Sequence, residues 1–211
     1  MVNHSTNGVA QPCWIDLVGS ELYYTTVLNE TLFGWRAGSA WSAHGSRFMF
    51  IGDGAPIAGA RANAAPGATL PRWRVHIDVD DVELTLRRAV EHGAAVIEGA
   101  EPIGERGVRA LIADPSGAPR GRWKPHDVGG SNTRFNVNAP RWFELRTSGY
   151  EVAAPIYRDV FDGDLRETSV QPGTRHATAH DGHEVRAFKD TPCGRRSAER
   201  DSSGVIFRVM S

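Results

Sequence analysis

Three short segments of the chain place aromatic, acidic and basic side chains at every second position. Alternate residues of a β-strand point to the same face, so each segment would present several of these groups to one surface. The sets are Trp14 and Asp16; Arg74, His76 and Asp78; and Trp142, Glu144 and Arg146. Such a surface can stack a planar ligand on its indole rings and hold the ligand's charged groups on its polar side chains.

Two kinds of chemistry fit these groups. In the first, the surface only binds an aromatic ligand, and the binding groups would be Trp14, Trp41, Trp73, Arg74, Asp78, Trp142 and Arg146. In the second, the surface catalyses proton transfer, because carboxylates and imidazole can serve as acid or base and a guanidinium can stabilise negative charge. Asp16, His76 and Glu144 would then be the acid or base groups, with Arg74 as the stabilising cation.

A purely structural interpretation covers the same residues. Aromatic side chains at alternating strand positions often fill a core, and Trp14 and Trp142 could do so here. Pairs such as Asp16 with Arg74 would then be salt links inside a barrel. The residue types alone leave the binding, catalytic and structural interpretations open.

Three histidines near the C-terminal end also have the spacing of some metal sites. They flank Asp181-Gly182, a pair typical of a tight hairpin turn between the predicted strands Arg175–His180 and His183–Phe188. We interpret the histidines as a solvated hairpin tip; they are His176, His180 and His183.

The composition narrows the class of protein. The chain has 211 residues, of which 40% are hydrophobic and 23% charged, as in ordinary globular proteins. Because 24 Lys and Arg face 25 Asp and Glu, the chain lacks the positive charge of a typical nucleic-acid binder. No stretch reaches the roughly 18 apolar residues of a membrane span, and the first residues lack the features of a secretion signal. With two cysteines, Cys13 and Cys193, we expect a cytoplasmic protein with no membrane or nucleic-acid partner.

The elements that would carry these side chains recur in one order. The first set is a strand over Cys13–Val18, a helix over Glu21–Phe33 between Ser20 and Gly34, and strands over Trp35–Ala43, Arg47–Gly52 and Ile57–Ala62. The second set is a strand over Arg72–Val79, a helix over Val82–His92 between Asp81 and Gly93, and strands at Ala95–Ile97, Val108–Ala113 and Arg120–Lys124. Alternating hydrophobicity predicts the strands, and capping residues predict the helix ends. Each set is a βαβββ unit.

The same order begins again in the second half. Trp142-Phe143-Glu144-Leu145 repeats Trp14-Ile15-Asp16-Leu17 after 128 residues, and a helix is predicted over Glu151–Phe161. Asp201-Ser202-Ser203-Gly204 repeats Asp114-Pro115-Ser116-Gly117 after only 87 residues, before a last strand over Val205–Met210. The difference of 41 residues corresponds to a strand, a helix and the next strand of the first half. We therefore expect a third βαβββ copy and a fourth reduced to its last two strands.

These repeats suggest a division into domains. We expect a flexible N-terminus at 1–11, a first domain of two modules at 12–126, a linker rich in Gly, Ser and Asn at 127–139, and a second, shortened domain at 140–211. A shortened domain leaves strand edges unpaired, and such edges invite association. The sequence therefore predicts either a homodimer or an enlarged pocket on the open side.

Three runs of the sequence carry a family pattern. They are CWIDLVGSEL with LNETLFGW, RWRVHIDVDDVELTLRRAVEHGAAV with GVRALIADPSGAPRGRW, and RWFELRTSGYEVAAPIYRDVFDG. Together they resemble the vicinal oxygen chelate superfamily of glyoxalases, bleomycin-resistance proteins and dioxygenases, and most of all its two-module actinobacterial glyoxalase-like branch. The resemblance extends from Pro12 to Met210. It implies an α+β fold of repeated βαβββ modules, whose mixed sheets curl into cups that each enclose a ligand site.

The resemblance also implies where a metal would be held. Metal-dependent members bind a divalent ion through His and Glu side chains inside the cup, and five positions of this chain correspond to those ligands. They are Trp14, Arg74 and Trp142 on first strands, and Gly121 and Arg208 on last strands. None of these side chains suits a metal ion, so we expect neither a metal nor another cofactor. A register shifted by two residues would offer Asp16, His76 and Glu144 instead, but it breaks the flanking match.

The expected function follows from these points. We expect a metal-independent protein that binds a small aromatic natural product, in secondary metabolism or self-resistance. The first alternative is a cofactor-independent isomerase, cyclase or lyase, and the second is a metal-dependent enzyme of the glyoxalase or dioxygenase type. A degenerate relative whose second half serves as an interface is a further interpretation. The expected partners are a planar small molecule and a second copy of the chain.

Overall fold

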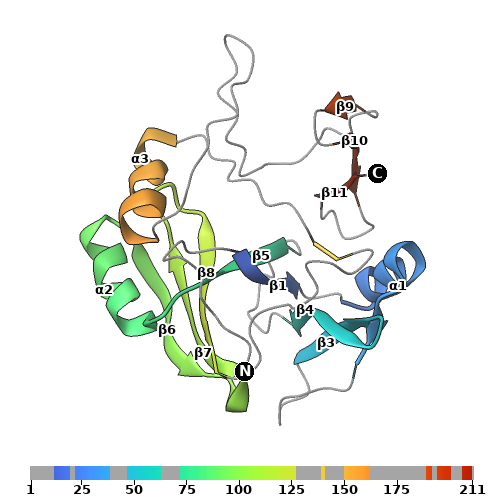
Figure 1. Ribbon diagram of the computed structural model, residues 1–211, viewed down its shortest axis with the longest axis horizontal. Helices are drawn as coiled ribbons and strands as arrows, with labels where there is room; N and C mark the ends of the chain where they lie inside the picture. The colour runs from blue at the N-terminus through green and yellow to red at the C-terminus, as the bar shows by residue number, and fades with distance from the viewer. Residues whose placement is uncertain are drawn as a thin grey trace. The chain divides into compact units, whose positions relative to one another are not determined.

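Two βαβββ modules follow one another along the chain (Figure 1). Module one consists of β1 (Pro12–Gly19), α1 (Leu22–Phe33), β2 (Arg36–Ala37), β3 (Arg47–Gly52) and β4 (Ala55–Ala62). Module two consists of β5 (Arg72–Asp78), α2 (Val82–Glu91), β6 (Ala95–Pro102), the 3-10 helix η1 (Gly104–Arg106), β7 (Gly107–Ala113) and β8 (Pro119–Pro125). The order predicted from the sequence is confirmed in both modules.

The computed structural model describes residues 12–19, 22–38, 47–62, 72–126, 139–140, 150–161, 189–191, 194–200 and 206–210, the last three segments by their backbone. The later elements are α3 (Tyr150–Pro155), the π-helix η3 (Ile156–Val160), β9 (Lys189–Thr191), β10 (Gly194–Arg200) and β11 (Ile206–Met210). The strand expected around Trp142 and the histidine hairpin lie outside the described residues. None of the described helices is long and apolar enough to cross a membrane.

The helix predicted over Glu151–Phe161 is present, but its type changes along its length. It is an α-helix up to Pro155 and a π-helix from Ile156. Proline has no N–H to donate to the preceding turn, and the change of type begins at the next residue. A helix that the sequence predicts as one regular element is therefore built from two kinds of turn.

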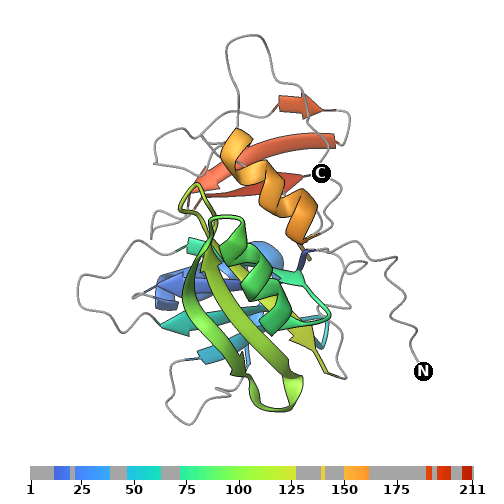
Figure 2. The same ribbon diagram turned by 90° about the vertical axis from the view of Figure 1, so that its left-hand side faces the viewer.

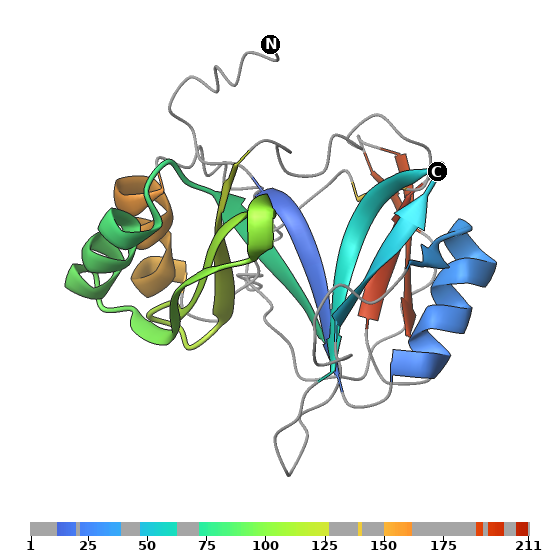
Figure 3. The same ribbon diagram turned by 90° about the horizontal axis from the view of Figure 1, so that it is seen from below.

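The strands of the two modules are hydrogen-bonded in equivalent orders. The order is β2-β3-β4-β1 in module one and β6-β7-β8-β5 in module two. In each module the first strand runs parallel to the last, and the other pairs are antiparallel. Asp16 of β1 pairs with Gly59 of β4, and His76 of β5 pairs with Gly121 of β8. The predicted α+β fold of repeated modules with curled mixed sheets is confirmed (Figure 3).

By their contacts, the described residues form two compact units that cut across the modules. Unit 1 contains β1 up to Ile15, β5 from Arg74 onwards, the rest of module two, α3 and η3. Unit 2 contains the rest of module one, the start of β5 up to Trp73, and β9, β10 and β11. The domain boundaries expected from the sequence stay a prediction.

The core of unit 1 lies between its sheet and two helical segments that cover one face of that sheet side by side (Figure 2). α2 contributes Val82, Leu86 and Ala89, which recur every three or four residues and so form one stripe of the helix. α3 and η3 contribute a second stripe, and β5 and β7 face both. This core consists of Ile77, Val82, Leu86, Ala89, Ala94, Ala110, Ile112, Ala153, Ile156, Tyr157, Val160 and Phe161.

The ends of α2 carry the caps that the sequence predicts. The carboxylate of Asp81 accepts a hydrogen bond from the Leu84 N–H at 2.9 Å, which satisfies one free donor of the first turn. Gly93 follows the last turn with φ +84°, a left-handed conformation that favours glycine. These local signals place the helix correctly against its sheet.

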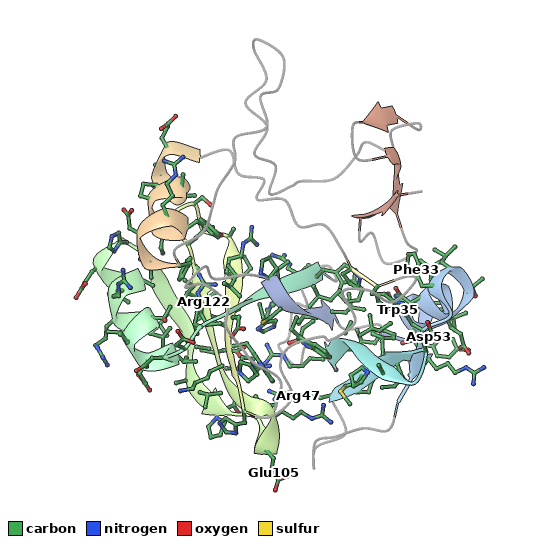
Figure 4. All side chains as sticks on the ribbon, viewed as in Figure 1. Phe33, Trp35, Arg47, Asp53, Glu105 and Arg122 are labelled. Carbon is green, nitrogen blue, oxygen red and sulfur yellow. The ribbon has the colours of Figure 1, made fainter. Side chains whose placement is uncertain are left out.

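In unit 2, α1 lies against one face of the module-one strands (Figure 3). Its inward side carries the buried polar residues Thr25 and Asn29, and Asn29 Nδ2 donates to the Thr25 carbonyl at 2.7 Å. Beside the helix is an aromatic cluster in which the rings of Trp35 and Phe33 lie 5.3 Å apart (Figure 4). Gly34 ends the helix with φ +68°, so the predicted glycine cap is confirmed.

Candidate functional site

The candidate site is the face of the unit 1 sheet that is turned away from α2, which we call the distal face. On β5, Ile77 belongs to the helix-side core, so Arg74, His76 and Asp78 share the distal face. On β8, Gly121 and Trp123 point the same way as His76, with which Gly121 is in register. The structure therefore brings together three of the residues that the sequence analysis singled out.

A network of charges extends across this face. The Arg109 guanidinium on β7 donates from Nη2 to Glu98 Oε2 at 3.2 Å and to Glu101 Oε2 at 3.3 Å. The other carboxylate oxygen of Glu98 lies 3.9 Å from Nη1 of Arg74. Glu98 is thus shared between two cations, and the buried Arg109 charge is balanced by two carboxylates. An anionic ligand group that took the place of Glu98 would meet two guanidinium groups.

Sequence reasoning missed Glu98, Glu101 and Arg109. One signal was present, because Arg109 is the single charged residue in the apolar strand sequence GVRALIA. The two glutamates gave no such signal. Their strand β6 pairs with β7 through two shifts of register, so simple alternation does not predict which face they join.

His76 is buried on the distal face, directly over Gly121. A Cβ atom added at Gly121 would lie 2.0 Å from His76 Nδ1, so the imidazole occupies the space that a side chain there would need. The ring of Trp123 meets the imidazole edge to face, with the centroids 6.3 Å apart. The result is a buried aromatic pair beside the charge network. An acid–base role for His76 stays a prediction.

The arrangement does not fit the metal site of the vicinal oxygen chelate superfamily. Of the positions that correspond to its ligands, Trp14 and Arg74 carry no donor for a metal, and Gly121 has no room for a carboxylate while His76 stays in place. Within the described part of the chain, no group of three or more His, Cys, Asp or Glu side chains could hold an ion.

The other predicted site residues are distributed differently. Trp14 is half-buried in unit 1, and Asp16 is half-buried in unit 2. Trp73 is on the face of β5 opposite to Arg74, and its ring packs in unit 2 at 6.2 Å from Trp35 and 6.3 Å from Phe50. The structure thus places Trp73 in an aromatic cluster of unit 2. Trp41, Trp142, Glu144 and Arg146 lie outside the described residues, as do His176, His180 and His183.

A second polar cluster lies on the helix side of the same sheet. Arg122 of β8 is 0% exposed and points toward the helices (Figure 4). Its Nη1 donates to the Gly121 carbonyl at 2.8 Å, and its Cζ lies 3.5 Å from the centre of the Phe161 ring, a cation–π contact. Among the described residues, its Nε and Nη2 have no hydrogen-bond partner. Burial lowers the pKa of Arg122 to about 9, which still leaves it protonated at neutral pH.

Tyr157 of η3 anchors the helical segment to this cluster. Its hydroxyl accepts a hydrogen bond from Arg120 Nε at 2.9 Å and donates one to Asp114 Oδ2 at 3.0 Å. Burial raises the pKa of Tyr157, so the phenol keeps its proton at neutral pH. The other oxygen of Asp114 accepts from the N–H groups of Ser116 and Ala118. The Asp114-Pro115-Ser116-Gly117 turn is therefore both a structural turn, as predicted, and the docking point of η3.

The burial of Arg122 could have been found in the sequence. In the strand PRGRWKP, Arg120 and Arg122 alternate with Gly121 and Trp123. Once Gly121 is assigned to the cup face, both arginines must face the helices. Gly121 corresponds to a cup-facing ligand position of the superfamily, so alternation along the strand is enough to place Arg120 and Arg122 on the opposite face.

Comparison with known proteins gives relatives but no matching family model. The chain is 28% identical over 153 residues to CFP32 of Mycobacterium tuberculosis, a provisionally named glyoxylase; the match covers 71% of this chain and 59% of that protein. It is 45% identical over 64 residues to the anthracycline biosynthesis protein DauV of Streptomyces sp. (strain C5), covering 30% of this chain and 22% of that protein. The similar protein DnrV of Streptomyces peucetius is 44% identical over 68 residues, covering 32% of this chain and 24% of its own length. The chain thus spans less than two thirds of each of these relatives.

Among solved structures, the Mn(II)-bound glyoxalase from Novosphingobium aromaticivorans overlaps 72% of this chain and 52% of its own, with 13% identity and a TM-score of 0.49. An overlap at that level carries no information on a metal or a substrate here. The curated relatives and the two βαβββ modules of equivalent strand order support the family pattern seen in the sequence. These similarities support a glyoxalase-like member of the vicinal oxygen chelate superfamily.

Proposed function

We propose that the chain binds a planar aromatic natural product without a metal ion, in secondary metabolism or self-resistance. The observation that carries the proposal is the seating of His76 over Gly121. It fills the position from which metal-dependent members of the superfamily reach their ion. In place of a metal centre, the distal face offers an aromatic pair and two guanidinium groups.

The distal face has the chemistry for such a ligand. Trp123 and His76 place two aromatic rings on this face, and Arg74 and Arg109 place positive charge beside them; of the four side chains, Arg74 is the one that is not buried, so a ligand would have to enter between the rings and what covers them. A fused-ring ligand with phenol, quinone or carboxylate oxygens could stack on the rings and receive hydrogen bonds from the guanidinium groups. DauV and DnrV are named for anthracycline biosynthesis, and anthracyclines are fused aromatic ring systems of this kind.

Titration with an anthracycline tests the proposal. The full chain, dialysed against EDTA, is titrated while tryptophan fluorescence and heat of binding are followed. We expect saturable binding of one molecule per chain that is unchanged when Mn²⁺ or Zn²⁺ is added. Binding that requires either ion, or no binding in both conditions, would overturn the proposal.

A pair of variants locates the binding surface. Arg74→Gln removes one half-buried cation of the distal face, and we expect it to weaken binding about tenfold, the loss typical of one hydrogen bond to a charged group. Arg87→Gln removes the same kind of side chain from an exposed position on α2, and we expect the affinity to stay unchanged. Equal effects of the two variants would place the ligand elsewhere.

A second candidate is a cofactor-independent isomerase, cyclase or lyase on the same face. The buried imidazole of His76, with the Arg74 cation on the same face, favours it. The anthracycline is recovered after incubation with the protein and analysed by chromatography and mass spectrometry. An unchanged compound supports the binding protein, whereas a product that His76→Gln no longer forms supports the enzyme.

A further inference from the structure

One edge of the Arg122 guanidinium has no protein partner among the described residues. The side chain is fully buried, and its Nη1 donates to the Gly121 carbonyl, whereas Nε and Nη2 donate to no described group. Nε and Nη2 form one edge of the planar guanidinium, and their N–H bonds point the same way. Because two unpaired donors in the interior cost free energy, we expect a group that accepts from both at once.

The surroundings of Arg122 also carry more positive than negative charge. Arg120 lies on the same face of β8, and its Nε donates to the Tyr157 hydroxyl. One oxygen of the Asp114 carboxylate accepts from Tyr157, and the other accepts from N–H groups of the turn that follows it. In the described part of the chain, this cluster therefore combines two guanidinium groups with one carboxylate. Since Arg122 is protonated at neutral pH, one positive charge is left to be balanced.

η3 and the residue that follows it cover this cluster from the helix side (Figure 4). The Phe161 ring centre lies 3.5 Å from Cζ of Arg122, so the ring stacks on the flat face of the guanidinium and leaves its edge open to an acceptor in the plane. The Tyr157 ring contacts Phe161, with the centroids 5.7 Å apart. An acceptor at the open edge would therefore lie between the sheet and the helical segment of the third copy.

We propose that the edge formed by Nε and Nη2 of Arg122 binds a small carboxylate ion. A carboxylate has two oxygens at the spacing of the two N–H groups, and it supplies the missing negative charge. A water molecule could accept a hydrogen bond there but would leave the charge unbalanced. Because Arg122 is fully buried, the ion must be small. This site is on the opposite face of the sheet from His76, so it is independent of the proposed function.

Titration with formate, the smallest carboxylate, tests the proposal. The full chain is kept in a buffer without carboxylates, and binding is followed by the line width of ¹³C-labelled formate in nuclear magnetic resonance spectra. We expect saturable binding of one ion per chain in the millimolar range. Thermal unfolding should shift to higher temperature as the site fills, because an ion that binds the folded state stabilises it. Chloride at the same ionic strength should give a smaller shift, since a spherical ion does not match the paired N–H groups.

Three variants make the test specific to Arg122. Arg122→Met removes the guanidinium, so both the saturable binding and the formate-dependent thermal shift should be lost. Arg122→Lys keeps the positive charge without the paired N–H groups, and it should weaken formate binding about tenfold. Arg87→Gln removes an exposed guanidinium from α2 and should leave binding unchanged. Circular dichroism verifies that each variant is folded.

Two results would overturn the proposal. Equal responses to formate in the wild type and in Arg122→Met would show an adventitious ion only. No response in the wild type would show that water, or a carboxylate of the chain itself, pairs with Arg122 instead.

Discussion

The two modules share one backbone plan but distribute polar and apolar groups differently. Because the pairs Asp16–Gly59 and His76–Gly121 are equivalent, the next residues along the last strands are Ala60 in module one and Arg122 in module two. Both are buried on the helix side of their sheets. A methyl group and a guanidinium thus occupy the same place in the fold, so strand order and register do not depend on which is present.

The helices of the two modules also bury side chains of different polarity. α1 buries Thr25 and Asn29, whereas α2 buries Leu86 and Ala89. The buried polar groups of α1 are tolerated because they bond within the helix, as Asn29 does to the Thr25 carbonyl. The βαβββ plan is therefore robust to the chemistry of its faces, which leaves those faces free to serve binding or association. Module two gains its apolar core partly from a segment of the third copy.

The largest expected effect concerns η3, the segment of the third copy that packs in the core of unit 1. Ile156→Ala removes a fully buried side chain of η3 from the core of unit 1, and we expect it to lower the free energy of unfolding by about 2–5 kcal/mol. Urea unfolding followed by circular dichroism measures the loss. Val152→Ala, on the exposed side of α3, is the control and should stay within about 0.5 kcal/mol of the wild type. Equal losses in both variants would show that η3 does not belong to this core.

The next largest expected effect is a gain in stability. Arg122→Met replaces the buried guanidinium by an apolar side chain of similar volume, and we expect the free energy of unfolding at pH 7 to rise by up to about 4 kcal/mol. The wild type must bury a charge with two N–H groups that have no partner among the described residues. Methionine removes this cost while it keeps the contact with Phe161. A clear loss of stability would mean that Arg122 is held by an interaction that the described residues do not contain.

The pH dependence of this variant follows from the pKa of Arg122, which burial lowers to about 9. Below that pH the folded wild type carries the full cost of the buried charge. Above it, the folded state releases the proton and the unfolded state keeps it, so wild-type stability rises with pH. The advantage of Arg122→Met should therefore be constant from pH 6 to 8 and shrink at pH 10. Urea unfolding at these pH values measures it, and an advantage that grows with pH would contradict the assignment.

Local patterns predicted much of this fold. β3 has the predicted bounds, and α2 begins at the predicted residue, because alternation and capping involve only neighbouring positions. β6 runs to Pro102, well beyond the predicted end at Ile97. Its register shifts break the alternation, so the extension depends on pairing with β7 and not on local sequence.

The candidate site shows the same limit on what local sequence patterns can predict. Arg74, His76 and Asp78 were predicted to share a face because they alternate within one strand. Trp73 was grouped with them by residue type, but it packs with Trp35 and Phe50 from distant parts of the chain. A contact of that kind depends on tertiary packing, which no single strand specifies. Sequence alone therefore predicts which residues share a strand face more reliably than which residues meet.

The smallest expected effect tests the equivalence of the modules most directly. Gly34 and Gly93 follow α1 and α2 with φ angles of +68° and +84°, and an added Cβ would contact nothing closer than 3.8 Å at either position. The cost of alanine is then backbone strain alone, about 1–2 kcal/mol in each case. Gly99→Ala in β6, where φ is ordinary and the space is open, should cost nothing. Thermal unfolding of the three variants measures the costs. Because α1 and α2 bury different side chains but end in the same kind of turn, similar losses at Gly34 and Gly93 would show that the backbone holds the shared plan. A much larger loss at one of them would mean that the two turns are not equivalent, so that the modules differ in their backbone as well as in their faces.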